Sequence, residues 1–191
     1  MKTVTIVSGL PRSGTSMMMK MLEAGGIRVL TDGERTADSD NPRGYFEFER
    51  AKKLRNGNVE WLSEAQGKAV KVISELLKWL APEYQYRIIF MRRNMEEVLA
   101  SQKKMLENRG TDSPAGPDDE TLAALFERHL EETRAWLARQ PNMETLYIDY
   151  SEVLSHPEVR IADLNTFLGG SLDTAAMAAA IDPKLHRQRR S

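Results

Sequence analysis

The stretch TVTIVSGLPRSGTS, residues 3–16, carries a β-rich apolar run into a glycine-rich turn and the start of a helical pattern. Its two glycines are spaced as in G-x-x-x-x-G-K-[ST], a loop that binds phosphate through backbone N–H groups. Thr15 stands where that signature has lysine, and the nearby cation is Arg12. Such a turn aims amides and a helix dipole at one point, so it predicts an oxyanion site in which Arg12 replaces the lysine. The alternative is an ordinary strand-to-helix turn.

Outward from this stretch, the apolar pattern alternates between strand and helix periods along the chain. Short β-rich runs predict strands, and apolar residues three or four positions apart predict amphipathic helices between them. The strands are expected over 3–9, 69–74, 86–92 and 143–150, and the main helices over 13–26, 94–106 and 118–140. This alternation predicts an α/β fold, a three-layer parallel-sheet P-loop architecture of the nucleotide-kinase kind with helices on both faces.

The composition restricts the class of protein. The 191 residues favour one domain over 1–191, with 41% hydrophobic and 29% charged residues as in ordinary globular chains. A formal net charge of -1 gives no overall attraction to nucleic acid or membranes, and no apolar run is long enough to span a bilayer. The absence of cysteine excludes disulfides and thiolate metal sites and fits a cytoplasmic protein. Residues 108–119 predict a mobile loop, either a lid or a tether.

The segment LPRSGTS, residues 10–16, resembles the 5′-phosphosulfate loop of the sulfotransferases that use 3′-phosphoadenosine 5′-phosphosulfate (PAPS). In that family a Pro-Lys/Arg-Ser-Gly-Thr-Thr/Ser stretch takes the place of the lysine-containing signature. The resemblance implies that PAPS is the donor, that PAP is the product, and that the donor's phosphosulfate group is bound by the following residues: Arg12, Ser13, Gly14, Thr15 and Ser16.

A second motif lies in FMRRNMEEVLAS, residues 90–101. In the same family, an arginine at the end of a later strand and a serine eight positions on bind the 3′-phosphate of the nucleotide. Arg93 and Ser101 have that spacing, and a guanidinium pairs bidentately with phosphate. Met95 departs from the family, which usually has proline there. The alternative is a charge at a helix start and a solvated serine.

A third segment, YSEVLSHP at residues 150–157, resembles the family's Tyr-Glu-Asp-Leu-x-x-Asp-Pro stretch. The resemblance implies that Tyr150 lies against the nucleotide, although a half-buried core tyrosine fits the position equally. The family's late Arg-Lys-Gly loop is missing from this sequence. The basic tail either substitutes for it or is only a solvated end, and it carries Arg187, Arg189 and Arg190.

The chemistry of sulfuryl transfer suggests further roles. Charge grows on the bridging oxygen as the nucleotide leaves, so positioned cations and N–H donors stabilise the transition state. Arg12 and the amides of 13–16 meet that need, and no metal is required because sulfate carries less charge than a terminal phosphate. Lys71 either neutralises the leaving oxygen or is a lysine at the surface end of a strand. None of the three histidines has a partner at metal-ligand spacing.

An acceptor base is expected in DNPRGYFEFER, residues 40–50, which resembles a segment with a catalytic glutamate in branches of the family. Carboxylates beside aromatic rings lose hydration and gain a raised pKa, which suits proton abstraction. The prediction is Glu47, with Glu49 in reserve; the alternative is a glutamate that only starts a helix. The neighbouring aromatic residues either line an acceptor pocket or belong to the core, and they are Tyr45, Phe46, Phe48 and Trp61.

Three functions are therefore compatible with the sequence. The first is a sulfotransferase that acts on a hydroxyl or amine of a small molecule, carbohydrate or peptide. The second is a P-loop kinase that uses ATP, in which Asp149 would hold magnesium. The third is a nucleotide-binding module without catalysis. The sequence indicates neither the acceptor nor the oligomeric state.

Overall fold

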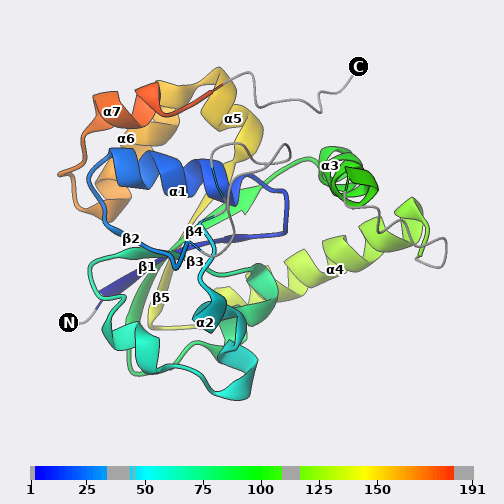
Figure 1. Ribbon diagram of the computed structural model, residues 1–191, viewed down its shortest axis with the longest axis horizontal. Helices are drawn as coiled ribbons and strands as arrows, with labels where there is room; N and C mark the ends of the chain where they lie inside the picture. Colours follow the sequence, from blue (N-terminus) through cyan, green and yellow to red (C-terminus); the bar gives the residue numbers. More distant parts are fainter. Residues whose placement is uncertain (1–2, 34–43, 45, 109–116, 183–191) are drawn as a thin grey trace.

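The computed structural model describes residues 3–33, 44, 46–108 and 117–182, and these form one all-parallel five-stranded sheet with helices on both faces (Figure 1). The sheet has the order β2-β3-β1-β4-β5. The strands are β1 (Thr3–Gly9), β2 (Val29–Leu30), β3 (Ala69–Lys71), β4 (Gln85–Arg92) and β5 (Met143–Asp149). The α-helices are α1 (Thr15–Ala24), α2 (Glu49–Lys52), α3 (Met95–Asn108), α4 (Asp119–Leu137), α5 (Tyr150–Ser155), α6 (Pro157–Leu168) and α7 (Thr174–Ala179).

The predicted α/β class and parallel sheet are confirmed, with local corrections. The strand expected over 69–74 ends at Lys71, and a 3₁₀-helix, η3 (Ser74–Trp79), follows it. The last strand ends at Asp149 because Tyr150 already begins α5. Two shorter 3₁₀-helices, η1 (Leu54–Asn56) and η2 (Glu60–Ser63), and the two-residue strand β2 were too short to leave a periodic pattern.

The predicted loop over 108–119 is partly corrected. Asn108 closes α3 and Asp119 opens α4, whose N-terminus is capped by the Asp118 carboxylate accepting from the Thr121 N–H. Residues 109–116 lie outside the described part of the chain. In the described ranges, no helix has both the length and the apolar character needed to cross a membrane.

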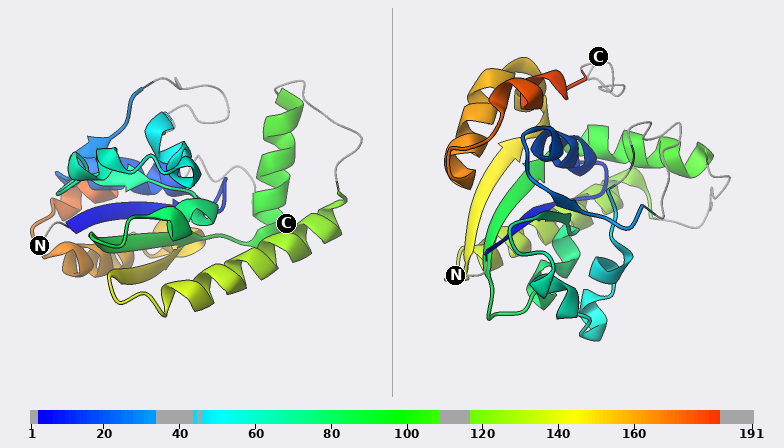
Figure 2. Two further views of the ribbon diagram at one scale, coloured as in Figure 1. Left: turned by 90° about the horizontal axis from the view of Figure 1, so that it is seen from below. Right: turned by 60° about the vertical axis from the view of Figure 1, so that its left-hand side comes forward.

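Two apolar clusters fill the two sides of the sheet because side chains alternate along each buried strand. On β1, Val4 and Ile6 belong to the cluster that α4 and η3 cover, whereas Val7 packs with the cluster beneath α1. Helices α5, α6 and α7 lie on the same side as α1, and α4 lies on the opposite side (Figures 1 and 2). The methionine-rich face of α1 is therefore core.

The carboxyl ends of the strands meet at one edge of the sheet, where ligands of such folds bind. The register pairs Val7 with Lys71 on one side of β1 and Gly9 with Met91 on the other. The loop after β1 therefore lies between the ends of β3 and β4. Helix α3 and the first half of α4 extend past this edge (Figure 2).

Candidate functional site

The loop after β1 depends on two glycines. Gly9 has φ 143°, and a Cβ there would lie 2.6 Å from both the Met91 carbonyl oxygen and the Ser13 Oγ. Gly14 has φ 98°, and its Cβ would lie 2.5 Å from Cδ2 of Tyr150. Real Cβ atoms do not approach other atoms so closely, and both φ values favour glycine. The sequence signature thus corresponds to a backbone that passes directly against β4 and α5.

Ser13 stabilises this loop through hydrogen bonds within the loop. Its side chain is buried, its Oγ donates to the Leu10 carbonyl at 2.7 Å, and its N–H donates to the same oxygen at 3.2 Å. Helix α1 then starts at Thr15, with Gly14 as its N-cap and no side-chain cap. The first amides of a helix have no carbonyl one turn back, so the anion-binding amides expected here are those from Gly14 onward.

Arg12 joins the first motif to the second. Its Nε donates to the Ser101 Oγ at 3.0 Å, and its carbonyl accepts from Nη1 of Arg93 at 3.1 Å. Arg12 also has φ 69°, a left-handed conformation that costs a non-glycine residue about 1–3 kcal/mol. The structure therefore brings Arg12, Arg93 and Ser101 into one cluster, although Arg12 precedes Arg93 by 81 positions and Ser101 by 89 positions in the sequence.

The side chain of Arg93 is largely buried and contacts three other groups of the cluster. Only 8% of its side chain is exposed, and its Nε donates to the Glu97 carboxylate at 2.8 Å. Its guanidinium carbon lies 4.5 Å from the ring centroid of Tyr150, a cation–π contact. Burial raises the pKa of Tyr150, and the nearby Arg93 opposes that rise. Tyr150 thus lies as a neutral, buried ring between Gly14 and Arg93.

Lys71 flanks the loop on its other side. It ends β3, and its Nζ donates to the Ser16 Oγ across 3.5 Å. Ser16, which carries this hydroxyl, lies in the first turn of α1. Cationic side chains therefore approach the loop from both neighbouring strands, Lys71 from β3 and Arg93 from the end of β4, around amides that attract anions.

Glu47 lies on a separate segment that is held by ion pairs. Its side chain is 14% exposed, and its Oε2 accepts from Lys52 Nζ at 2.6 Å, while Lys52 also pairs with Glu49. Burial opposes the charge of Lys52, but the hydrogen bonds to Glu47 and Glu49 outweigh it and raise the lysine pKa. The Glu47 carbonyl accepts from Thr31 Oγ1 at 2.8 Å. These contacts tie the segment to the chain after β2.

The aromatic residues around Glu47 belong largely to the core. Trp61 is fully buried and meets Phe48 edge-on, with ring centroids 5.5 Å apart. Phe46, at φ 51°, packs against the other cluster, beneath α1. Phe48 and Trp61 therefore belong to the core, while Tyr45 lies outside the described residues.

Asp149, the magnesium ligand of the kinase alternative, pairs with Arg92 at 2.6 Å. In the described ranges, no three His, Cys, Asp or Glu side chains are grouped so as to hold a metal. The tail residues Arg187, Arg189 and Arg190 lie outside those ranges.

Sequence reasoning missed two contacts. Glu97 follows Arg93 by four residues, the i,i+4 spacing at which opposite charges can pair, so this ion pair was detectable from the sequence. His129 of α4 lies 2.8 Å from the Ser74 Oγ through its Nε2. That contact joins residues 55 positions apart and left no local signal.

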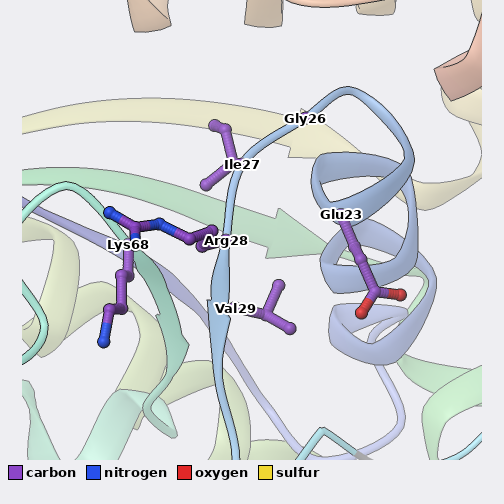
Figure 3. A pocket seen from close by; sticks show the side chains of 6 residues that line it. All are labelled: Glu23, Gly26, Ile27, Arg28, Val29 and Lys68. Carbon is purple, nitrogen blue, oxygen red and sulfur yellow. The ribbon is translucent and has the colours of Figure 1, made fainter.

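A surface hollow of about 420 Å³ lies away from this edge, beside the end of α1 (Figure 3). Arg28 and Lys68 stand together on one side and Glu23 on the other. Both basic residues directly precede their strands, β2 and β3, so the hollow lies near the amino ends of the strands. It is therefore separate from the loop at the carboxyl ends.

Comparison with known families gives one match over nearly the whole chain. A model of the sulfotransferase domain family matches residues 2–184. A search of curated protein sequences finds no match.

Solved structures share the fold at low identity. A sulfotransferase from Mycobacterium tuberculosis H37Rv superposes with a TM-score of 0.61 at 17% identity, covering 95% of this chain and 72% of that one. A mouse sulfotransferase complexed with PAP gives 0.54 at 17% identity, covering 94% and 62%. A retinol dehydratase in complex with androsterone and inactive cofactor PAP gives 0.51 at 16% identity, covering 94% and 63%. The chain thus spans less than two thirds of the length of the last two.

Proposed function

Because the chain belongs to the sulfotransferase family, we propose that it uses PAPS as donor and moves the sulfuryl group to a hydroxyl or amine of an acceptor. One observation carries this proposal: the loop and the second motif are in direct contact, through Arg12 with Ser101 and Arg93 with the Arg12 carbonyl. A single ligand with two anionic groups can therefore reach both motifs. A nucleotide with a 5′-phosphosulfate and a 3′-phosphate is such a ligand.

The two ends of the donor are assigned to different residues. The amides from Gly14 to Ser16 surround the phosphosulfate, since the start of α1 offers N–H groups and a positive dipole end. Arg93 and the Ser101 hydroxyl bind the 3′-phosphate. Arg12 lies between them, because its Nε reaches Ser101 while its backbone belongs to the loop. The close approach of Gly14 to the Tyr150 ring supports this fit, because it leaves no room for a side chain at the amide that the ligand meets.

Transfer needs an acceptor oxygen in line with the sulfur and the bridging oxygen. PAPS supplies an activated sulfuryl group. Arg12, Lys71 and the loop amides stabilise the charge that grows on the leaving oxygen, because fixed donors cost no reorganisation at that moment. Glu47 accepts the proton of the acceptor hydroxyl, with Glu49 as the second candidate. Lys52 pairs with both carboxylates and so holds the two candidates close to each other.

The donor assignment is tested by binding of PAP, AMP and ATP, measured by calorimetry. Only PAP carries a 3′-phosphate, so PAP is expected to bind at least about 10-fold more tightly than AMP, as for one charge-assisted contact. Arg93→Ala should remove this preference. Arg92→Ala is the matched control, because Arg92 is the adjacent residue and pairs with Asp149 instead. Equal affinity for PAP and AMP in the unmodified protein would refute the assignment of PAPS as the donor.

The transfer itself is tested with PAPS labelled in its sulfuryl group and a pool of alcohols, amines, sugars and peptides. Label in an acceptor product establishes catalysis and identifies the acceptor class. Tight PAP binding with no transfer to any acceptor favours the non-catalytic module. Hydrolysis or transfer from ATP favours the kinase, which the pairing of Asp149 with Arg92 already disfavours.

A further inference from the structure

A carboxylate stands inside the cluster that should bind the 3′-phosphate. Glu97 pairs with Arg93 at 2.8 Å, and the two side chains are only 13% and 8% exposed. The same spacing and the same distance occur in Arg128–Glu132 on α4, but those side chains are 78% and 65% exposed. Water screens the pair on α4, whereas it cannot screen the buried pair as well. The charge of Glu97 therefore acts strongly on whatever approaches Arg93.

The hydrogen bonds of Arg93 occupy two of the five N–H groups of its guanidinium. Nε donates to Glu97, and Nη1 donates to the Arg12 carbonyl. Among the described residues, Nη2 is the nitrogen with no hydrogen bond. Each Nη carries two N–H groups, so a phosphate can still bind through Nη1 and Nη2, but it then shares the guanidinium with Glu97, which holds Nε.

Sharing one guanidinium between two anions has an electrostatic cost. A phosphate monoester carries a charge of about -1.5 to -2 near neutral pH. Bound to Nη2, it would share one guanidinium with a carboxylate already bound to Nε. Two like charges this close in a partly buried site repel each other. The pair thus holds Arg93 in place over Tyr150, and it also cancels much of the charge that the ligand would feel.

We propose that Glu97 is a built-in counter-anion that limits the affinity of this site for the 3′-phosphate. The inference rests on the proposed PAPS-dependent function. In the free protein Glu97 keeps the buried guanidinium neutralised and oriented. When the nucleotide binds, its 3′-phosphate competes with the carboxylate for Arg93. The product PAP, which retains this phosphate, is consequently held less tightly and leaves sooner.

The experiment compares PAP with AMP on the full chain carrying Glu97→Gln. The glutamine oxygen still accepts from Arg93 Nε, so the change removes charge while it keeps the hydrogen bond. We expect PAP to bind about 10-fold more tightly, as for the loss of one close like-charge contact, while AMP affinity stays the same. The dissociation rate of PAP should fall in parallel. Glu96→Gln removes the charge of the exposed neighbouring carboxylate and should change neither the PAP affinity nor the PAP dissociation rate.

The possible results separate this inference from the proposed function. A PAP preference that is present in the unmodified protein but does not increase in Glu97→Gln overturns the counter-anion role and leaves the donor intact. No PAP preference in the unmodified protein overturns both. If Glu97→Gln does not fold, Glu97→Ala serves in its place, because it removes the same charge. An unchanged or smaller PAP-to-AMP affinity ratio in that folded variant also overturns the proposal.

Discussion

The loop after β1 and the segment around Glu47 differ in what holds them. The loop is shaped by backbone conformation and buried contacts, with two glycines pressed against neighbouring atoms and Arg93 packed on Tyr150. The Glu47 segment is held by ion pairs of Lys52, a lysine whose side chain is 49% exposed. Buried backbone geometry tolerates few substitutions, whereas partly exposed ion pairs tolerate many. The loop, which is the proposed donor site, is therefore rigid. The Glu47 segment, which is the proposed acceptor site, can be changed with little loss of stability.

The largest effect should come from Gly14→Ala. The new Cβ would clash with the Tyr150 ring at 2.5 Å, and φ 98° disfavours any side chain. We expect the free energy of unfolding to fall by about 2–4 kcal/mol and PAP binding to be lost. Denaturant unfolding measures the free energy of unfolding, and calorimetry measures PAP binding.

Gly26→Ala is the matched control for that variant. Gly26 has nearly the same φ, 96°, but a Cβ there meets nothing within 4 Å. It should lose only about 1 kcal/mol of stability, the cost of the backbone strain, and bind PAP normally. Equal losses in the two variants would mean that the contact with Tyr150 contributes nothing.

Arg12→Gly should separate stability from activity. Glycine relieves the strain of φ 69°, so stability should rise by up to about 1 kcal/mol, while sulfuryl transfer falls about 1000-fold because a cation of the site is lost. Arg12→Ala removes the cation but keeps the strain, so it should lose transfer without gaining stability. A Gly variant with normal transfer would show that Arg12 is only a loop residue.

Glu47→Gln should lower kcat about 100-fold, the usual contribution of a general base, and leave PAP affinity unchanged. Steady-state kinetics with an identified acceptor measure the loss. Glu49→Gln is the internal comparison, since both carboxylates pair with Lys52. A larger loss at Glu49 would transfer the role of base to that residue.

The smallest effect should come from Lys52→Ala, with a stability change within about 1 kcal/mol because its ion pairs are partly exposed. The Lys52 pKa is raised in the folded protein, so its contribution is present below the ordinary lysine value of 10.5 and is lost as the pH rises above it. Unfolding at pH 8 and above pH 11 measures this. A loss of several kcal/mol at pH 8 would mean that the Glu47 segment is as rigid as the loop.

The sequence predicted different parts of the molecule unequally. The strand, glycine turn and helix around 3–16 were predictable because their pattern is local and strong. β2 and the 3₁₀-helices were not, since elements of two to six residues show no period. The core positions of Phe48 and Trp61 were not predictable either, because an aromatic residue suits a core and a pocket equally.

By itself, the sequence determined the α/β class, the place of the glycine turn between β1 and α1, and the spacing of Arg93 and Ser101. These depend on periodicity, backbone propensity and short separations along the chain, all of which are local. Only the tertiary structure decided that Arg12 meets Ser101 and that Glu97 and Tyr150 enclose Arg93. Such contacts depend on the strand order, which places β4 beside β1, and on how buried side chains share the space between them.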